Sequence, residues 1–271
     1  MLWPDRAPDT ALASAAVEKT VSGMIENVSR PTMTVFSPTG KNTGVAVLVF
    51  PGGGYHKLAI GLEGTEMCDW LVSKGITCVL LKYRVPKSGP YWDSQCKCHI
   101  TPPSPLALQD AQRTLGLVRY HAAEWHIDPR KVGVLGFSAG GHLTAAISTH
   151  FERAYSVVDD ADKQSSRPDF AVALYPGHLW VDEEKFELNP DIRVTKQTPP
   201  TFLVQAENDP VDDINHSLVY YIALRKAGVP VEMHLYAEGG HAFGLRRTTQ
   251  PITGWPELFQ SWLKTIHMID A

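Results

Sequence analysis

The stretch KVGVLGFSAGG, residues 131–141, joins a β-strand pattern to a helical pattern rich in small residues. A serine between glycines at such a junction is typical of a nucleophile elbow. The turn would hold Ser138 in strained backbone geometry, and a side chain at Gly136 or Gly140 would collide with the neighbouring helix or strand. Free N–H groups at the start of the helix would favour negative charge beside Ser138. The alternative interpretation is an ordinary glycine-rich turn that carries a serine.

Apolar runs alternate with helical patterns on both sides of this stretch. This alternation indicates an α/β fold with a mostly parallel, doubly wound sheet and helices on both faces. Besides the elbow strand, we expect strands at 32–36, 45–50, 77–81, 170–174, 201–206 and 231–236, and helices at 65–74, 105–122, 215–227 and 256–268. We expect one domain over 1–271, with 1–30 as an N-terminal extension and two loop or cap insertions at the active site, 86–105 and 177–200.

Composition narrows the class of ligand. The chain has 271 residues, 44% of them hydrophobic, and a formal net charge of -4 with both signs mixed along its length. The absence of a basic stripe argues against a nucleic-acid partner, and the absence of a long apolar run argues against a membrane span. The first residues lack the apolar centre of a signal peptide. The compartment stays open between secreted or periplasmic, if a signal peptide was removed, and cytoplasmic.

The cysteines do not predict a disulfide scaffold, because a chain of this length has only four of them: Cys68, Cys78, Cys96 and Cys98. The run CKCH at 96–99 looks like part of a metal site, but no second close pair of ligands accompanies it. We therefore expect no metal, and either free thiols or one or two disulfides.

A serine hydroxyl needs a base in order to act as a nucleophile at neutral pH. Of the eleven histidines, His241 is favoured, because it lies in EGGHAFG, residues 238–244, just beyond the last expected strand. In an open parallel sheet that loop meets the elbow at the carboxyl edge, where ligands bind. The rival His142 lies four residues beyond Ser138 on the same helix, so it is expected to pack or cap instead of reaching back.

The base needs an orienting acid. Asp209 follows the strand at 201–206 and projects at the same edge of the sheet. Asp212 is the alternative, since a loop of this length allows either geometry; it and Asp213 also suit the start of the next helix. With Asp209 as the acid, the chain order is Ser138, Asp209, His241, which is the order of an α/β-hydrolase.

Donors for a tetrahedral oxyanion are expected from PGGGY, residues 51–55, which follows an early buried strand. Consecutive glycines let the main chain approach a ligand with N–H groups pointing inward. The N–H groups of Gly53, Gly54 and Ala139 would form the oxyanion hole. A phosphate-binding loop is the alternative, but neither glycine run carries the Lys-Ser, Lys-Thr or final glycine of a nucleotide motif.

Together, PGGGY at 51–55, KYR at 82–84, GFSAGGH at 136–142 and GGHAFG at 239–244 resemble the α/β-hydrolase superfamily. Within it, the chain from about residue 31 onward is most similar to small carbohydrate esterases, which include acetylxylan esterases and bifunctional feruloyl and acetylxylan esterases. Hormone-sensitive-lipase-type esterases are also similar, but they usually have histidine where this chain has Pro51. The resemblance implies an α/β-hydrolase fold, and it assigns nucleophile, acid and base to Ser138, Asp209 and His241.

The predicted activity is hydrolysis of short-chain esters, by two-step acyl transfer and without a cofactor. The substrate would be a small molecule or an oligosaccharide such as acetylated xylan. Exposed rings in long loops could stack on sugar faces, so the expected substrate-binding residues are Tyr55, Tyr91, Trp92 and Trp180. One alternative is a peptidase or formamidase of the same fold. Another is a catalytically silent hydrolase fold that binds a ligand or protein.

Overall fold

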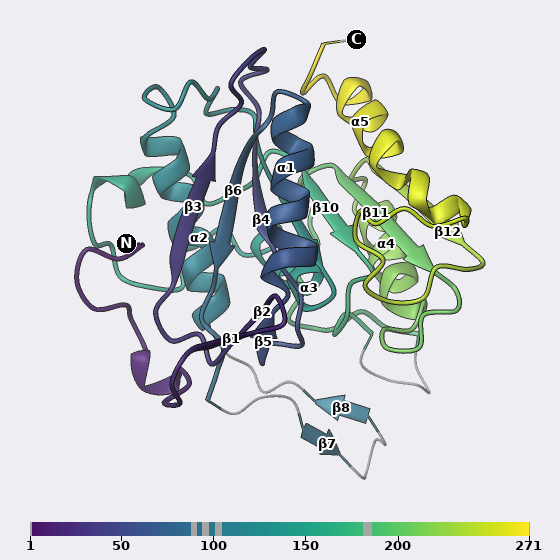
Figure 1. Ribbon diagram of the computed structural model, residues 1–271, viewed down its shortest axis with the longest axis horizontal. Coiled ribbons are helices and arrows are strands. Elements are labelled where there is room, and N and C mark those ends of the chain that lie inside the picture. The colour runs from purple at the N-terminus through teal and green to yellow at the C-terminus, as the bar shows by residue number, and fades with distance from the viewer. Residues whose placement is uncertain (1, 88–90, 94–97, 101–104, 181–185, 271) are drawn as a thin grey trace.

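The fold is built on a seven-stranded sheet (Figure 1). The computed structural model describes residues 2–87, 91–93, 98–100, 105–180 and 186–270, with the backbone alone at 91–93 and 98–100. Across the sheet the strands run in the order β12 (Val231–Tyr236), β11 (Thr201–Ala206), β10 (Ala171–Leu174), β9 (Val132–Phe137), β4 (Ala46–Phe50), β6 (Thr77–Lys82) and β3 (Thr32–Phe36). Only β3 is antiparallel to its neighbour. The predicted doubly wound α/β-hydrolase sheet is therefore confirmed.

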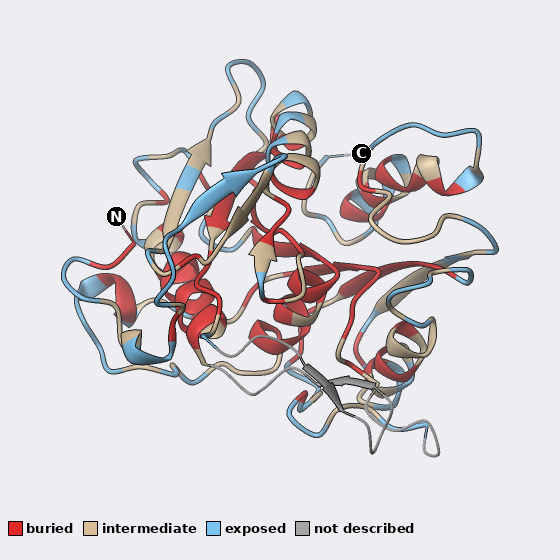
Figure 2. Cartoon of the chain, turned by 60° about the horizontal axis from the view of Figure 1, so that its bottom comes forward, coloured by how far each residue is buried: buried red, intermediate tan, exposed pale blue. Residues whose placement is uncertain are grey.

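Helices cover both faces of the sheet (Figure 1). One face packs against α1 (Glu66–Ser73) and α5 (Trp255–Thr265), and the other against α2 (Leu106–Tyr120), α3 (Ala139–Ile147) and α4 (Asn215–Lys226). Strands covered on both faces must be apolar at every position, which explains the continuous apolar runs in the sequence. Figure 2 shows the resulting buried centre, with exposure confined mainly to the outer sides of helices and to loops.

The central strand β4 fixes where the site forms. It pairs with β6 on one side and with β9 on the other, so the direction of winding reverses between β4 and β9. Ligands bind at such a switch point in open α/β sheets, outside the carboxyl ends of the strands. The glycine run after β4 and Ser138 after β9 both lie there.

Short elements complete the chain. A π-helix at Ile60–Thr65 leads into α1, and 3₁₀ turns lie at Thr10–Leu12, Asp160–Lys163 and Pro251–Gly254. The helix expected from residue 65 therefore starts as a π-helix five residues earlier. Residue 104, immediately before the helix expected at 105–122, lies outside the described residues.

The predicted N-terminal extension carries structure that the sequence analysis missed. Strands β1 (Lys19–Val21) and β2 (Met24–Glu26) form a hairpin, and β2 also pairs with β5 (Lys57–Leu58) in a second, three-stranded sheet. Leu2 and Trp3 are buried in the main core, where the Trp3 indole N–H donates to Asp110 at 2.9 Å. The first residues thus contribute to the core as well as to the surface.

The insertion at 86–105 also departs from the expected loop. Strands β7 (Tyr91–Asp93) and β8 (Cys98–Ile100) pair antiparallel as a hairpin, which extends from the lower end of the molecule in Figure 1. Strands of three residues are too short to show a sequence period, so the pattern gave no sign of them. In the other insertion, 177–200, the described residues are irregular apart from a bridge between Trp180 and Leu188.

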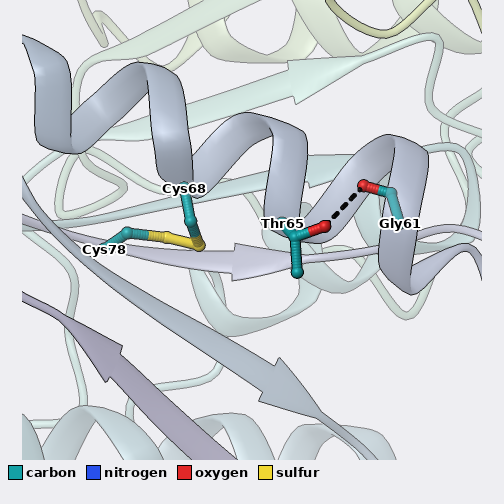
Figure 3. Close-up of a disulfide and its surroundings, with 4 residues drawn as sticks. All are labelled: Gly61, Thr65, Cys68 and Cys78. Atoms are coloured by element: carbon teal, nitrogen blue, oxygen red, sulfur yellow. Dashed lines mark hydrogen bonds between the residues drawn. A yellow bond between two sulfur atoms is a disulfide. The ribbon is translucent and has the colours of Figure 1, made fainter.

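A disulfide joins α1 to the sheet (Figure 3). Cys68 lies in α1 and Cys78 in β6, ten residues further along the chain, and both are fully buried. This outcome falls within the expectation of one or two disulfides. The other two cysteines, and with them the run CKCH at 96–99, are not described at the side-chain level.

Removing this disulfide should destabilise the fold. Closing a loop of this length restricts the unfolded chain, and the expected contribution is about 2 to 3 kcal/mol. We expect the double substitution Cys68→Ala and Cys78→Ala to lower the free energy of unfolding by that amount, measured by urea denaturation of the oxidised protein. An unchanged unfolding midpoint would show that the bond does not stabilise the native state.

Candidate active site

Four chain segments converge at the carboxyl edge of the sheet. Ser138 follows β9, Asp209 follows β11, His241 follows β12, and the glycine run at 51–54 follows β4. Asn208 links two of these loops, because its side-chain oxygen accepts hydrogen bonds from the N–H groups of Gly239 and Gly240 at 3.0 and 2.9 Å. The loop that carries His241 is thereby tied to the loop that carries Asp209.

The elbow at Ser138 has the strained geometry that the sequence predicts. Its backbone φ and ψ are 53° and −118°, a region that L-residues rarely adopt. A Cβ on Gly136 would stand 2.0 Å from the carbonyl oxygen of Gly140, and a Cβ on Gly140 would stand 2.0 Å from that of Phe50. Both glycines are therefore required by the close approach of α3 to β9 and β4.

Ser138, His241 and Asp209 form a continuous hydrogen-bonded chain. His241 Nε2 lies 3.1 Å from Ser138 Oγ, and His241 Nδ1 lies 2.8 Å from Asp209 Oδ2. The Asp209 side chain is completely buried, whereas the His241 side chain is 15% exposed. Asp209 Oδ2 also accepts a hydrogen bond from Gln205 Nε2 at 3.2 Å. This is the geometry of a nucleophile, a base and an orienting acid.

Electrostatics favour a charged imidazolium at His241. Burial disfavours that charge, but the hydrogen bond with Asp209 and the charges of Asp212, Asp209 and Glu63 outweigh it, and the pKa of His241 is raised above its ordinary value. An imidazolium forms when a histidine takes the proton of a serine nucleophile. The surrounding carboxylates therefore stabilise the charge that such a proton transfer creates.

The alternative acid, Asp212, lies on the other side of the imidazole ring. Its Oδ2 accepts a hydrogen bond from Ser138 Oγ at 3.1 Å and stands 3.8 Å from His241 Nε2. An orienting acid must bond Nδ1 when Nε2 faces the serine, and Asp209 does so. Asp213 is exposed, and its carboxylate accepts from the N–H of Asn215 at the start of α4, as expected for a capping residue.

The glycine loop packs directly behind the nucleophile. A Cβ on Gly52 would stand 2.9 Å from the Ser138 Cβ. The Gly52 N–H donates to Glu63 Oε2 at 2.7 Å, and Tyr175 donates its hydroxyl proton to Glu63 Oε1 at 2.9 Å. In the described part of the chain, the N–H groups of Gly53 and Gly54 are not used in hydrogen bonds. They remain the predicted oxyanion donors, together with Ala139 at the N-terminus of α3.

Comparison with known proteins places the chain in a family. The model of the prolyl oligopeptidase family matches residues 108–266, and the BD-FAE family model matches residues 33–176, each more than half of the chain. The crystal structure of an acetyl ester-xyloside bifunctional hydrolase from Caldicellulosiruptor lactoaceticus is 33% identical, with a TM-score of 0.73 over 88% of this chain and 89% of that one. The chain belongs to the α/β-hydrolase esterases.

Two relatives of this α/β-hydrolase have names that refer to xylan. An acetylxylan esterase of Xylanibacter ruminicola is 29% identical over 86% of this chain and 48% of its own length. An endo-1,4-beta-xylanase B of Butyrivibrio fibrisolvens is 26% identical over 77% of this chain and 34% of its own length. The hydrolase thus spans a third to a half of the length of these curated relatives.

The four aromatic residues predicted to bind substrate differ in how deeply they are buried and in what they contact. Tyr55 is buried, and its hydroxyl lies 2.8 Å from His142 Nδ1. Trp180 is partly exposed, and its ring lies edge-on to His216. Tyr91 and Trp92 lie in β7, and their side chains are outside the described residues. Substrate contact by these four residues stays a prediction.

His142 packs against a neighbouring residue, as its place on α3 suggested. His142 Nδ1 lies 2.8 Å from the Tyr55 hydroxyl, and burial, together with the charges of nearby histidines, lowers the pKa of His142 to about 3. A histidine with so low a pKa is neutral at physiological pH, and its ring is already engaged by Tyr55. It therefore supports the fold of the α/β-hydrolase beside the elbow.

Glu63 is the site residue that sequence reasoning missed. Its side chain bridges the glycine loop and Tyr175, and burial raises the pKa of its carboxyl group. It lies between Gly61 and Gly64, just before the helix expected at 65–74, where a charged residue looks like part of a solvated surface. Only the unusual pair of flanking glycines hinted at close packing.

Two further observations concern ligands and membranes. Among the described residues, histidine, cysteine and carboxylate side chains do not gather in groups of three or more suited to a metal ion. Within the same residues, every helix is too short or too polar to cross a membrane.

Proposed function

We propose that this hydrolase cleaves short-chain, acetyl-type esters on carbohydrate, such as acetylated xylan, through an acyl-enzyme on Ser138. The observation that carries the proposal is the chain of hydrogen bonds from Ser138 through His241 to Asp209. Similarity to an acetylxylan esterase and to an acetyl ester-xyloside hydrolase supports the carbohydrate substrate. The names of these two proteins also support esters over other acyl substrates.

In the acylation step, Ser138 Oγ attacks the ester carbonyl carbon while His241 Nε2 takes the hydroxyl proton. Asp209 holds the ring through Nδ1 and stabilises the imidazolium. The N–H groups of Gly53, Gly54 and Ala139 stabilise the oxyanion. The ester C–O bond then breaks, and His241 returns the proton to the leaving alcohol. In the second step water attacks the acyl-enzyme by the reverse sequence and releases the carboxylic acid.

Acetate release tests the substrate. We expect the enzyme to release acetate from acetylated xylooligosaccharides and from a simple aryl acetate, with release from both abolished by Ser138→Ala. Acetate would be quantified by chromatography over time. Turnover of the aryl ester alone would leave the mechanism standing and remove the carbohydrate assignment.

Amide cleavage is the second candidate, because the prolyl oligopeptidase family model matches residues 108–266. Paired substrates with the same acyl group, one an aryl ester and one an aryl amide, separate the two reactions. We expect kcat/KM for the ester to exceed that for the amide by orders of magnitude. Comparable values would favour the peptidase function.

A further inference from the structure

Asp212 places a second carboxylate against the nucleophile. Its Oδ2 lies 3.1 Å from Ser138 Oγ and 3.8 Å from His241 Nε2. Ser138 Oγ is thus within hydrogen-bond distance of two acceptors, His241 and Asp212, although it has only one proton. The orienting role belongs to Asp209 on Nδ1, so the mechanism described above leaves Asp212 without a function.

The position of Asp212 is held by several contacts. Its N–H donates to Asp209 Oδ1 at 3.1 Å, and its carbonyl oxygen accepts from Gln205 Nε2 at 3.0 Å. The side chain is only 13% exposed. Residue 177 leaves room for the carboxylate, since a Cβ on Gly177 would stand 2.5 Å from Asp212 Oδ1. The backbone of Asp212 is therefore fixed by the catalytic acid Asp209 and by Gln205, which also donates to Asp209.

The hydrogen-bond donor to Asp212 must change between the two steps of the reaction. In the free enzyme Asp212 Oδ2 accepts from the Ser138 hydroxyl. In the acyl-enzyme Oγ is an ester oxygen and has no proton to donate, so Asp212 loses this donor. A buried carboxylate without a donor is costly. A water molecule beside the acyl group can replace the donor, and it would stand within reach of His241 Nε2.

We propose that Asp212 is a catalytic residue of deacylation, which accepts a hydrogen bond from the hydrolytic water while His241 removes the other proton. The inference rests on the proposed acyl-enzyme mechanism. The water oxygen forms a bond to the acyl carbon and its proton passes to His241 Nε2. The bond from the acyl carbon to Ser138 Oγ then breaks, Oγ takes the proton from His241, and the acid leaves. The Ser138 hydroxyl again donates to Asp212, which stays ionised throughout.

The charge state of Asp212 is compatible with this role. Burial raises its pKa to about 6, with the charge of His241 and the hydrogen bond from Ser138 acting in the opposite direction. The group is therefore mainly an anion at neutral and alkaline pH, and an anion is an acceptor only. In acylation the charge of Asp212 stabilises the imidazolium, but Asp212 loses the hydrogen bond from the serine hydroxyl, so these two effects oppose one another. In deacylation the charge of Asp212 again stabilises the imidazolium, and the hydrogen bond that it accepts holds the attacking water, so both effects favour the reaction.

The test compares Asp212→Asn, which keeps the size and removes the charge, with Asp212→Ala, which removes the acceptor. With an aryl acetate, we expect kcat of both variants to fall by about 10- to 100-fold, the size of effect expected for loss of one hydrogen bond to a charged acceptor. KM should fall by nearly the same factor, so kcat/KM changes little. Rapid mixing should then show a burst of aryl alcohol close to one equivalent per active site, because the acyl-enzyme accumulates.

Asp213→Asn is the matched control, since Asp213 is exposed and only caps α4. It should retain the wild-type kcat and KM. An unchanged kcat in both Asp212 variants overturns the inference, and so does a loss shared equally by kcat and kcat/KM without a burst. Thermal unfolding of each variant shows that the fold is retained. Failure of the proposed function is a different result, in which Ser138→Ala keeps full activity.

Discussion

Ser138→Ala is expected to reduce kcat for an aryl acetate by on the order of 10⁶-fold, because removal of the nucleophile leaves only the oxyanion hole and substrate binding to act. Alanine fits the site, since the elbow is formed by the backbone and Ser138 already has a positive φ. The hydroxyl makes contacts with His241 and Asp212 alone among the described side chains. Thermal unfolding should therefore be nearly unchanged while turnover disappears.

Ser148→Ala is the matched control for this variant. Ser148 lies at the C-terminal end of the same helix, is fully buried, and has a hydroxyl without a hydrogen-bond partner within the described residues. Its replacement should leave kcat unchanged. A fluorophosphonate probe should label the wild type and Ser148→Ala but not Ser138→Ala. Full activity of Ser138→Ala would remove the nucleophile assignment, and absence of labelling in the wild type would favour a silent binding protein.

The elbow was predictable because its chemistry is local. Only glycine fits at positions 136 and 140, because a Cβ at either position would stand 2.0 Å from a backbone carbonyl oxygen. These two glycines therefore reveal a three-dimensional constraint in the sequence itself. The sheet was predictable for a related reason. Strands such as β4 and β9 are buried along their whole length, and burial on both faces permits only continuous apolar runs.

The short N-terminal hairpin was missed, although its turn carries a signal. Ser22 and Gly23 join β1 to β2 with φ values of 50° and 77°, as in a two-residue type I′ turn. The flanking strands are only three residues long, and β1 is exposed, so neither shows a hydrophobic alternation. A turn of this kind, Ser-Gly between two β-prone triplets, is the feature that could have revealed it.

The roles of the two carboxylates after β11 could not be separated from the sequence. Asp209 and Asp212 lie three residues apart in one loop, and the sequence of that loop does not determine which carboxylate faces the Nδ1 atom of His241. What separates them is tertiary structure: Gln205 and the N–H groups of Val211 and Asp212 orient Asp209, while the space above Gly177 admits Asp212. Glu63 escaped notice for the same reason, because its partners Gly52 and Tyr175 come from distant segments.

Asp209→Asn should lower kcat and kcat/KM together by about 10⁴-fold, because an amide cannot hold the tautomer of His241 that has its proton on Nδ1. An asparagine can keep the hydrogen bonds that Asp209 Oδ1 accepts from Val211 and Asp212, so its NH₂ group would face His241 Nδ1. The ring would then carry its proton on Nε2 and could not accept the proton of Ser138. The pKa of His241 should also fall, since a hydrogen bond and a charge that raise it are lost.

Asp212 cannot replace the missing acid, because it faces Nε2 and has no contact with Nδ1 within the described structure. The kinetic pattern therefore distinguishes the two carboxylates: Asp209→Asn impairs acylation and deacylation alike and gives no burst, whereas loss of Asp212 slows the second step alone. Steady-state and rapid-mixing kinetics of both variants, with Asp213→Asn as the control, decide between them. Should Asp209→Asn keep more than about a tenth of wild-type kcat/KM while Asp212→Asn loses about 10⁴-fold, the orienting acid would be Asp212, in the role that a triad requires.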